Sequence, residues 1–510
     1  MLWIALFLPE LPLQLAQRAQ QTVDPATIAC VIADGPALRP LVCCANTAAR
    51  ERGVKIGMPV AAARALVGEL AVLPRDKATE LQALYNFAGW AGQFTPSVSV
   101  QAAEGLLLEV DSTLSLHGGL SRLLVRIGKG ITALGYQAQP GIAPTPLAAW
   151  WLAKARALGL RTRMCRTVEL LPQRLAPLPL LLLDWPVATL QQLQALGIGT
   201  IGQCLQLPRD GFIHRFGHER RLDLDRALGD APDPRAWFTP PDTFSSRLEF
   251  GFELNDAMML LFPLKRLLQE FEGFLRARGA GVQHWQLLLD HMNHGHTTLA
   301  INVATPERSA ERFLLLAREK LAQLAIKPVT AVGGKAAAGS TASAPILALA
   351  ITADKLVEFE EHNRSFLRDA RSDAIGWQHL VDRLATRLGN NQVYRLRAID
   401  DHRPEQAWQA ADPAHGNSST SAARSNTAPL LPRPLWLLRM PRVLKSEHDL
   451  PLYAGRLHFI AGPERIEAGW WDGSVARRDY YVARNARGET LWIYREHQLS
   501  ARWFLHGVFS

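Results

Sequence analysis

The sequence predicts an α+β protein made of several domains. Its 510 residues exceed what one hydrophobic core normally covers, and an apolar content of 48% allows each domain to fold. Predicted strands alternate with helices in residues 1–165. A compact helical stretch and a β-α-β-β-α-β order follow, and an aromatic-rich segment with frequent turn residues ends the chain.

Residues 1–165 are predicted to form an α/β or α+β domain. Residues 2–8 are a short apolar run ended by proline, which is the pattern of a fully buried strand. A helix rich in Leu, Gln and Ala is expected over residues 13–21. Further elements are expected at residues 28–32, 45–52, 59–66, 105–110, 120–134, 141–143 and 147–157.

The middle of the chain changes from a helical pattern to an α+β pattern. Residues 168–234 are compact and helical, with Leu190, Leu193 and Leu196 on one helix face before Gly197. The β-α-β-β-α-β order then follows. Its expected elements are a strand near Leu248, a helix at 256–278, a hairpin at 285–303, a helix at 310–324, a loop at 333–343 and a strand at 346–351.

The C-terminal part is predicted to contain a separate module. A helix is expected over residues 375–388, and residues 415–427 are a polar tract of Ser, Ala, Asn and Thr. Such a tract buries too little apolar surface to fold, so it is a linker. Residues 435–510 are rich in aromatic and turn residues and are predicted to be mostly β.

The charge of the chain favours a polyanionic partner. The net charge is +9 and the isoelectric point is about 9.5, which makes nucleic acid the leading candidate. No membrane partner is expected, because the apolar run at residues 2–8 is far shorter than the ~20 residues of a membrane span. No signal peptide is indicated either.

The cysteines suggest a reducing compartment. There is no C-x-x-C pair, so neither a disulfide framework nor a zinc site is expected, and the cytoplasm is the predicted location. No other metal and no cofactor is expected. The five cysteines are Cys30, Cys43, Cys44, Cys165 and Cys204. A metal cluster at His291, His294 and His296 is an alternative, but Asn-His-Gly favours a hairpin turn.

The glycine motif of residues 197–202 predicts a DNA-binding helix-hairpin-helix. Its residues are Gly197, Ile198, Gly199, Thr200, Ile201 and Gly202. Glycines let the backbone turn tightly and point successive N–H groups at a phosphate, which is contact without sequence preference. Nearby basic residues such as Arg276 and Arg278 are expected to assist. The alternative is an ordinary glycine turn between two packed helices.

Residues 45–59 carry a second signal, Ala-Asn-Thr-Ala-Ala-Arg-Glu-Arg-Gly-Val-Lys-Ile-Gly-Met-Pro. From charge alone, its three cations, Arg50, Arg52 and Lys55, favour a solvated helix end, and a phosphate site beside the glycine turn is the alternative. The segment resembles the fingers motif A-N-Y-x-A-R-x-x-G-V-x-x-G-M-P of the Y-family DNA polymerases.

This resemblance covers roughly residues 1–360 and implies the domain order of that family. Residues 1–165 would be palm and fingers, residues 166–240 a thumb with a helix-hairpin-helix, and residues 243–360 a little finger. Residues 361–429 would then hold a helix and linker, and residues 430–510 a C-terminal module.

The catalytic positions depart from the family pattern. Two-metal phosphoryl transfer needs several carboxylates around two cations. In the aligned positions, Pro9 and Leu11 replace the first-strand acids, and Glu104-Gly105 replaces the later Asp-Glu pair. We therefore predict a protein without polymerase activity; an active translesion polymerase is the alternative.

The aligned nucleotide pocket is also eroded. Thr47 stands where the family has tyrosine, whereas the family arginine is retained as Arg50. Thr145-Pro146 replaces an asparagine-lysine pair, so a lysine that binds triphosphate is missing.

The noncatalytic branch of the family, the ImuB proteins, shows the same pattern. Residues 462–473, 478–481 and 503–509 resemble the C-terminal signature of that branch. The resemblance implies a DNA-binding scaffold in translesion synthesis and damage-induced mutagenesis within the SOS response. Its implied partners are DNA, the replication sliding clamp, ImuA and an error-prone DnaE-type polymerase.

Two sets of residues are candidate partner contacts. Trp470, Trp471 and Trp503 represent the aromatic module, where a β core or a protein interface is favoured over base stacking. Residues 362–367 resemble, in degenerate form, the clamp-binding peptides of the family, with Asn363 in place of glutamine and Phe366-Leu367 as the apolar pair. Packing of that pair on the following helix is the alternative.

Overall fold

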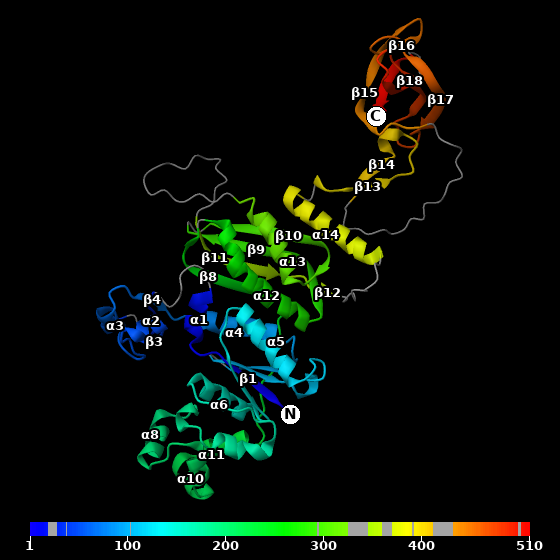
Figure 1. Cartoon of the computed structure of the whole chain (residues 1–510). Coiled ribbons are helices and arrows are strands. Elements are labelled where there is room, and N and C mark those ends of the chain that lie inside the picture. The colour runs from blue at the N-terminus through cyan, green and yellow to red at the C-terminus, as the bar shows by residue number, and fades with distance from the viewer. Residues whose placement is uncertain are drawn as a thin grey trace. The chain divides into compact units, whose positions relative to one another are not determined.

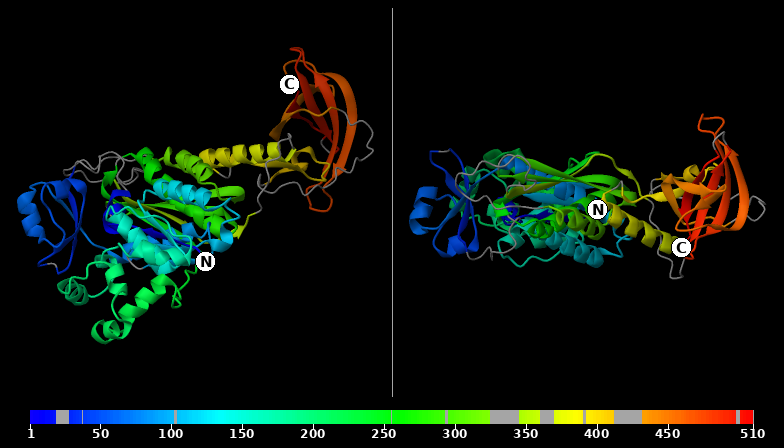
Figure 2. Two further views of the ribbon diagram at one scale, coloured as in Figure 1. Left: turned by 60° about the horizontal axis from the view of Figure 1, so that its bottom comes forward. Right: turned by 90° about the horizontal axis from the view of Figure 1, so that it is seen from above.

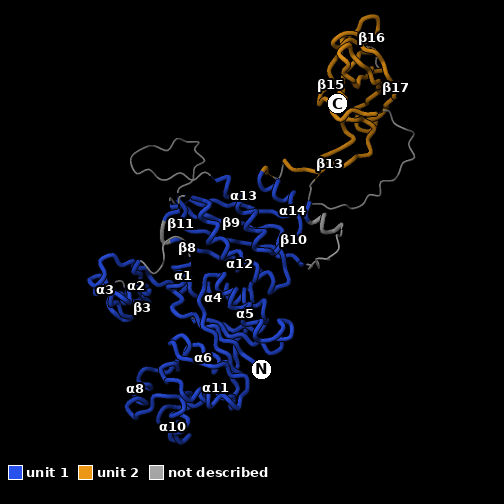
Figure 3. The backbone as a smooth tube through the Cα atoms, viewed as in Figure 1, with its two compact units in different colours: residues 1–387 blue, residues 388–510 orange. Residues whose placement is uncertain are grey.

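The structure is a computed structural model that divides into two compact units, residues 1–387 and 388–510 (Figure 3). It describes residues 1–18, 28–36, 38–101, 104–254, 256–292, 295–324, 345–359, 370–389, 392–411, 432–497 and 501–509. No helix in these described parts is both long enough and apolar enough to cross a membrane.

A four-stranded antiparallel sheet organises the first unit (Figure 1). Its strand order is β5-β6-β1-β7, with β1 at Trp3–Phe7, β5 at Val98–Gln101, β6 at Gly105–Glu109 and β7 at Gln139–Ala143. The register pairs Ala5 with Leu107 on one side and with Gly141 on the other. The apolar run predicted as a buried strand is therefore a central strand.

Both faces of β1 are covered, which explains its unbroken apolar sequence. Ile4 and Leu6 pack against α4 (Lys77–Ala91) and α5 (Leu120–Ala133). Trp3 and Ala5 pack against α6 (Pro146–Ala157) and the helices after it. Because side chains alternate along a strand, neither set can be polar without facing a hydrophobic layer.

A smaller sheet with the order β3-β2-β4 lies after α1 (Leu11–Arg18). β2 is antiparallel to β3 and parallel to β4. Its elements are β2 (Cys30–Asp34), β3 (Leu41–Ala45), α2 (Thr47–Glu51), α3 (Val60–Leu66) and β4 (Ala71–Pro74). The helices predicted at 45–52 and 59–66 are confirmed in shortened form.

The helical segment extends the core beneath α6. Leu175, Leu193 and Phe212 join α6 residues in one hydrophobic cluster. The helices are α7 (Leu171–Leu175), α8 (Val187–Ala195), α9 (Ile201–Leu205), α10 (Arg209–Phe216) and α11 (His218–Leu228).

The predicted β-α-β-β-α-β order is confirmed. The sheet order is β10-β9-β11-β8, and the short β12 (Val357–Glu358) pairs with β9. The elements are β8 (Phe244–Leu254), α12 (Leu261–Ala277), β9 (Ala280–His291), β10 (His296–Glu307), α13 (Ala310–Leu321) and β11 (Ile346–Ala353). Strands β9 and β10, on either side of the expected turn, are antiparallel, and Asn293 and His294 of that turn lie outside the described residues. Helix α14 (Ala370–Leu388) follows.

A buried ion pair joins this second sheet domain to the N-terminal one. Arg18 at the end of α1 donates to Glu270 of α12 at 3.0 Å, and their side chains are 5% and 1% exposed. Ser246 also donates to Glu270, and Arg18 donates to the Tyr136 hydroxyl and the Leu134 carbonyl. Burial opposes the Arg18 charge, but these neighbours outweigh it and raise the pKa of the guanidinium.

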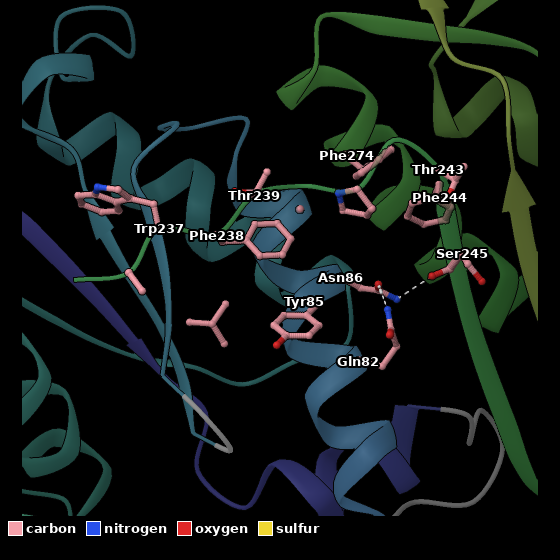
Figure 4. Close-up of a pocket in the computed structure, with 14 residues that line it drawn as sticks. Gln82, Tyr85, Asn86, Trp237, Phe238, Thr239, Thr243, Phe244, Ser245 and Phe274 are labelled. Atoms are coloured by element: carbon pink, nitrogen blue, oxygen red, sulfur yellow. Dashed lines mark hydrogen bonds between the residues drawn. The ribbon is translucent and has the colours of Figure 1, made fainter.

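The chain between the two domains is fastened over a cavity of about 650 Å³ (Figure 4). Trp237 stacks on Trp3 of β1, and Phe238 stacks on Tyr85 of α4. The amide of Phe238 donates to the Val98 carbonyl at 2.7 Å. The connection is thus an ordered strap that contacts both neighbouring domains.

The second unit contains a curved six-stranded antiparallel sheet (Figure 2). Apolar side chains lie on both of its faces: Leu491 and Ile493 belong to one cluster, Trp492 and Tyr494 to another. The order is β16-β15-β20-β19-β18-β17, with β15 (Trp436–Glu447), β16 (Leu450–Leu452), β17 (His458–Ala468), β18 (Ala476–Arg484), β19 (Thr490–Glu496) and β20 (Trp503–Val508). The predicted β-rich C-terminal module is confirmed.

A hairpin that the sequence did not reveal also belongs to this unit. It is formed by β13 (Arg395–Ala398) and β14 (Trp408–Ala411). Glu405, between these strands, accepts a hydrogen bond from Arg478 of β18 at 2.8 Å. The module therefore begins before the polar tract and not after it.

The buried ion pair gives a stability prediction. Glu270→Ala should lower the free energy of unfolding by about 3–5 kcal/mol, because it leaves the Arg18 charge buried without its carboxylate. Urea unfolding of the full chain, followed by circular dichroism, measures this effect. The matched control, Arg18→Met with Glu270→Leu, removes both charges and should be much closer to neutral. A single variant as stable as the parent would contradict the prediction.

Candidate functional site

The polymerase-like site lies where β1 ends and β6 begins. Pro9 and Leu11 follow β1, and the amide of Leu8 donates to the Glu104 carbonyl at 2.7 Å. Gly105 has a φ of +152°, and a Cβ built on it would lie 2.0 Å from the Leu6 carbonyl oxygen. An acidic side chain therefore has no room at Gly105 unless the backbone moves.

Glu10 lies between the two aligned acid positions. Its φ of +53° is in the left-handed region, where a residue with a side chain is strained. Its carboxylate accepts two hydrogen bonds from Arg50, at 2.8 and 3.3 Å. The pair is partly exposed, so it adds little stability. The pair does mean that Arg50, the arginine that the sequence predicts to be retained from a nucleotide pocket, already binds a carboxylate of the same chain.

Glu104, the remaining aligned carboxylate, faces a lysine. The Nζ of Lys154 lies 3.7 Å from Glu104 and also contacts Asp184. Partial burial raises the pKa of the Glu104 carboxyl, although Lys154 opposes that shift. The described part of the chain contains no group of three or more His, Cys, Asp or Glu side chains that could hold a metal ion.

The other predicted pocket positions have structural roles or are exposed. The Thr145 hydroxyl donates to the Ala227 carbonyl at 2.8 Å, and Pro146 begins α6. Thr47 is the exposed first residue of α2. Within the described part of the chain, neither threonine is hydrogen-bonded to Arg50 or Glu104.

The glycine motif forms the predicted turn between α8 and α9. Gly197 has a φ of +76°, and Gly202 packs so closely on Ala176 that a Cβ would lie 2.8 Å from the alanine Cβ. Thr200 caps α9 in a capping box with Gln203.

The amides of this turn already have acceptors. Gln203 Oε1 accepts from Gly199 at 2.7 Å and from Thr200 at 3.1 Å. The amides of Gly197, Ile198, Ile201 and Gly202 donate to the carbonyls of Gln194, Leu193, Leu178 and Ala176, respectively. A phosphate would have to displace the Gln203 side chain before it could bind here, so the predicted role of the turn stays a prediction.

The two arginines expected to assist DNA binding are also engaged. Arg276 pairs with Glu272 one turn earlier on α12. Arg278 donates to the carbonyls of Pro240 and Pro241, at 3.0 and 2.8 Å, and to Asp242. Arg278 therefore fastens the strap between the two sheet domains of the first unit, a role that the sequence did not indicate.

Two of the predicted partner residues form an exposed pair at the loop between β17 and β18. Trp470 and Trp471 are 72% and 57% exposed, and their rings meet edge to face at 4.7 Å. Gly469, with φ of +85°, begins the loop; a Cβ there would lie 2.3 Å from the Ser474 carbonyl oxygen.

A buried arginine fixes this loop. Arg403, from the segment between β13 and β14, makes two bonds to Asp472, at 3.1 and 2.6 Å, and one to the Ser474 carbonyl. It also pairs with Asp401 and lies 5.6 Å from the Trp471 ring centroid. Residues separated by the polar tract thus preorganise the tryptophan pair.

Trp503 requires a correction. Only 5% of it is exposed, and it belongs to a hydrophobic core cluster with Leu491, Ile493 and Leu505. Its indole N–H donates to the Asp449 carbonyl at 3.0 Å. It is a core residue and not a partner contact, because its position on the strand directs it toward a covered face of the sheet. The clamp candidates Asn363, Phe366 and Leu367 lie outside the described residues.

Comparisons with known proteins agree with this arrangement. Residues 14–154 match the model of the impB/mucB/samB family. Protein ImuB of Caulobacter vibrioides (strain NA1000 / CB15N) is 29% identical over 90% of this chain and all of its own length. DNA polymerase IV of Dehalococcoides mccartyi (strain CBDB1) is 25% identical over 49% of this chain and 64% of its own length.

The similarity to ImuB covers 90% of the chain and therefore extends into the second unit, whereas that to DNA polymerase IV covers about half of the chain. The chain is an ImuB-like homologue of the Y-family DNA polymerases. Two solved structures are also similar: DinB from Sulfolobus solfataricus (TM-score 0.38, 16% identity, 71% of this chain and 100% of that one) and an insertion ternary complex of Dbh DNA polymerase (TM-score 0.39, 16% identity, 70% and 100%).

The contrast among the three tryptophans gives a testable prediction for this homologue. Trp503→Ala should lower the free energy of unfolding by about 3–5 kcal/mol, because it empties a packed core position. Trp470→Ala with Trp471→Ala should change it by about 0.5 kcal/mol or less, because both rings are exposed. Thermal unfolding of the full chain measures both effects. Equal losses in the two variants would show that the exposed pair is also a core element.

Proposed function

We propose that this protein is a noncatalytic DNA-binding scaffold in translesion synthesis and damage-induced mutagenesis. In this proposal it links the replication clamp, ImuA and an error-prone DnaE-type polymerase in the cytoplasm, as part of the SOS response. Its polymerase-like unit would comprise palm and fingers (1–165), thumb (166–240) and little finger (243–360). The C-terminal unit would provide the partner surface.

The state of the polymerase-like site is the observation that carries the proposal. Pro9 and Leu11 supply no metal ligand, and Gly105 has no room for a side chain. The charges that remain nearby pair with one another, Arg50 with Glu10 and Glu104 with Lys154. A two-metal mechanism needs several carboxylates at one place that are free to bind cations, and here Glu10 and Glu104 are each paired with a basic side chain.

The exposed tryptophan pair supports the scaffold role. Large exposed aromatic side chains that a rigid loop displays are typical of contact residues at protein interfaces. Asp401 and Asp472 both form ion pairs with Arg403, and Glu467 lies opposite Arg477 on the neighbouring strand. Because these charges are paired, the exposed rings are the main contact surface of the loop, which suits an apolar pocket on a protein partner.

The first functional prediction is the absence of nucleotide incorporation. The purified chain, supplied with primed DNA, deoxynucleotides and either Mg²⁺ or Mn²⁺, should not extend the primer, because Pro9, Leu11 and Gly105 supply no carboxylate for a two-metal site. A catalytic Y-family polymerase assayed in parallel is the positive control. Template-dependent extension that Glu104→Ala abolishes would overturn the proposal in favour of an active polymerase.

The second prediction concerns the C-terminal unit. Deleting residues 389–510 should abolish damage-induced mutagenesis and the capture of ImuA and the polymerase while sparing DNA binding. The same deletion begun at residue 430 leaves Arg403 and Glu405 without their sheet partners, so it is the less clean variant. Trp470→Ala with Trp471→Ala is the point-substitution counterpart. Capture that survives both changes would assign partner binding to another region.

The third prediction tests the clamp peptide. Phe366→Ala with Leu367→Ala should weaken binding to the sliding clamp without changing DNA affinity or melting temperature, because a docking segment contributes little to the folded core. Surface plasmon resonance on immobilised clamp gives the affinity. Unchanged clamp binding would reject the site, and a lower melting temperature would favour packing on the following helix.

A further inference from the structure

Three arginines from three different elements line one cavity of about 400 Å³ in the first unit. Arg156 is in the last turn of α6, Arg174 is in α7, and Arg163 lies on the segment between these helices. Arg156 and Arg163 are exposed and Arg174 is half-buried. No acidic side chain is among the described residues that line the cavity.

The walls of this cavity are rigid. The amide of Cys165 donates to the Ile142 carbonyl at 2.9 Å, so the segment that carries Arg163 runs beside the edge strand β7. Gly141 of β7 lies against α6 so closely that a Cβ would be 2.0 Å from the Ala149 carbonyl oxygen. The strand, the segment and α6 therefore hold the backbones of Arg156 and Arg163 in fixed relative positions.

The three guanidinium groups are free of internal ion pairs. None of them makes a salt bridge with any residue that the structure describes, in contrast to Arg50, Arg276 and Arg278. Arg161 and Arg166, on the same segment, are exposed and likewise unpaired within the described residues. Three like charges around one cavity repel one another, which is unfavourable unless an anion binds among them.

We propose that this arginine cavity binds phosphate groups of a DNA backbone. Guanidinium groups bind phosphate oxygens through paired, charge-assisted hydrogen bonds, and several at one place bind it more firmly than scattered cations do. The inference rests on the DNA binding in the proposed function and names the residues that supply much of it. The glycine turn of residues 197–202, whose amides already have acceptors, then contributes less to DNA binding than the arginines do.

The location of the cavity fits a DNA contact that continues toward this turn. Arg174 is two residues before Ala176, whose carbonyl accepts from Gly202 at 3.0 Å. Arg174 of α7 lines the cavity, and Ala176, directly after α7, contacts the turn, so the two features adjoin along this stretch of chain. A DNA strand that contacts the turn can reach the arginines by continuing along the same helical segment.

The test compares two triple variants of the full chain. Arg156→Gln, Arg163→Gln and Arg174→Gln remove the cavity charges. Arg439→Gln, Arg456→Gln and Arg487→Gln are the matched control: these arginines of the second unit are exposed and make no ion pair with described residues. Fluorescence anisotropy with labelled single-stranded and duplex oligonucleotides gives the affinity over a range of salt concentrations. Melting temperatures establish that the variants fold.

The cavity variant should bind DNA roughly tenfold or more weakly, and its slope of log affinity against log salt should fall by about three. The control variant should retain most of the affinity. Lysine at the same three positions should restore the slope of log affinity against log salt. This variant keeps the proposal testable if the glutamine variant does not fold.

Two further arms distinguish the source of the anion. A titration with dATP tests a free nucleotide, and one with a poly-glutamate peptide tests an acidic protein segment. Loss of either ligand from the cavity variant with unchanged DNA affinity would overturn the assignment to DNA. Failure of the parent chain to bind DNA at all would instead reject the DNA-binding part of the proposed function.

Discussion

Burial of β1 on both faces is the constraint on which the first unit depends. Ile4 and Leu6 face one helical layer while Trp3 and Ala5 face the other, so the strand tolerates polar groups only beyond its end. The neighbouring β6 approaches so closely at Gly105 that no side chain fits beside Leu6. The hydrophobic layers, the strap at Trp237 and the helices beneath α6 all use this strand as their support. In a polymerase the same strand end would also have to present metal ligands. Here the end of β1 packs closely against β6 instead.

The charged side chains around the polymerase-like site are paired with one another. A lone arginine or carboxylate in a partly buried place is unfavourable unless it is hydrated or paired. Arg50 binds Glu10, and Glu104 faces Lys154, which also contacts Asp184. Each pair has at least one partly exposed member, so the pairs stabilise the fold only slightly. Their main consequence is for binding, since a nucleotide or metal would have to break them first.

Sequence reasoning predicted the elements with strong local signals. The apolar run of β1, the β-α-β-β-α-β order and the turn at Gly197 follow from periodicity and glycine positions, which are local properties. The misassigned residues depend on contacts between distant segments. Trp503 and Trp470 are the same residue type in one aromatic module, yet only the strand register decides that the first is buried. Arg278 looks like a free cation until the strap at residues 240–242 is placed beside it. The hairpin with Arg403 lies before a linker, so nothing local connects it to Asp472.

Preorganisation connects the second unit to its proposed role. Association costs conformational entropy, and a loop that is already fixed before binding loses less of it. Arg403 fixes the loop of Trp470 and Trp471 through the Asp472 carboxylate and the Ser474 carbonyl, and its own burial limits the access of water to those bonds. The stabilisation of this loop is obtained from residues on the far side of the polar tract in the sequence. The buried Arg403 holds two exposed rings in place. These rings do not stabilise the module on its own, since exposed tryptophans are unfavourable in water. The arrangement becomes favourable when a partner covers the rings, which is the physical reason to regard this loop as a docking element.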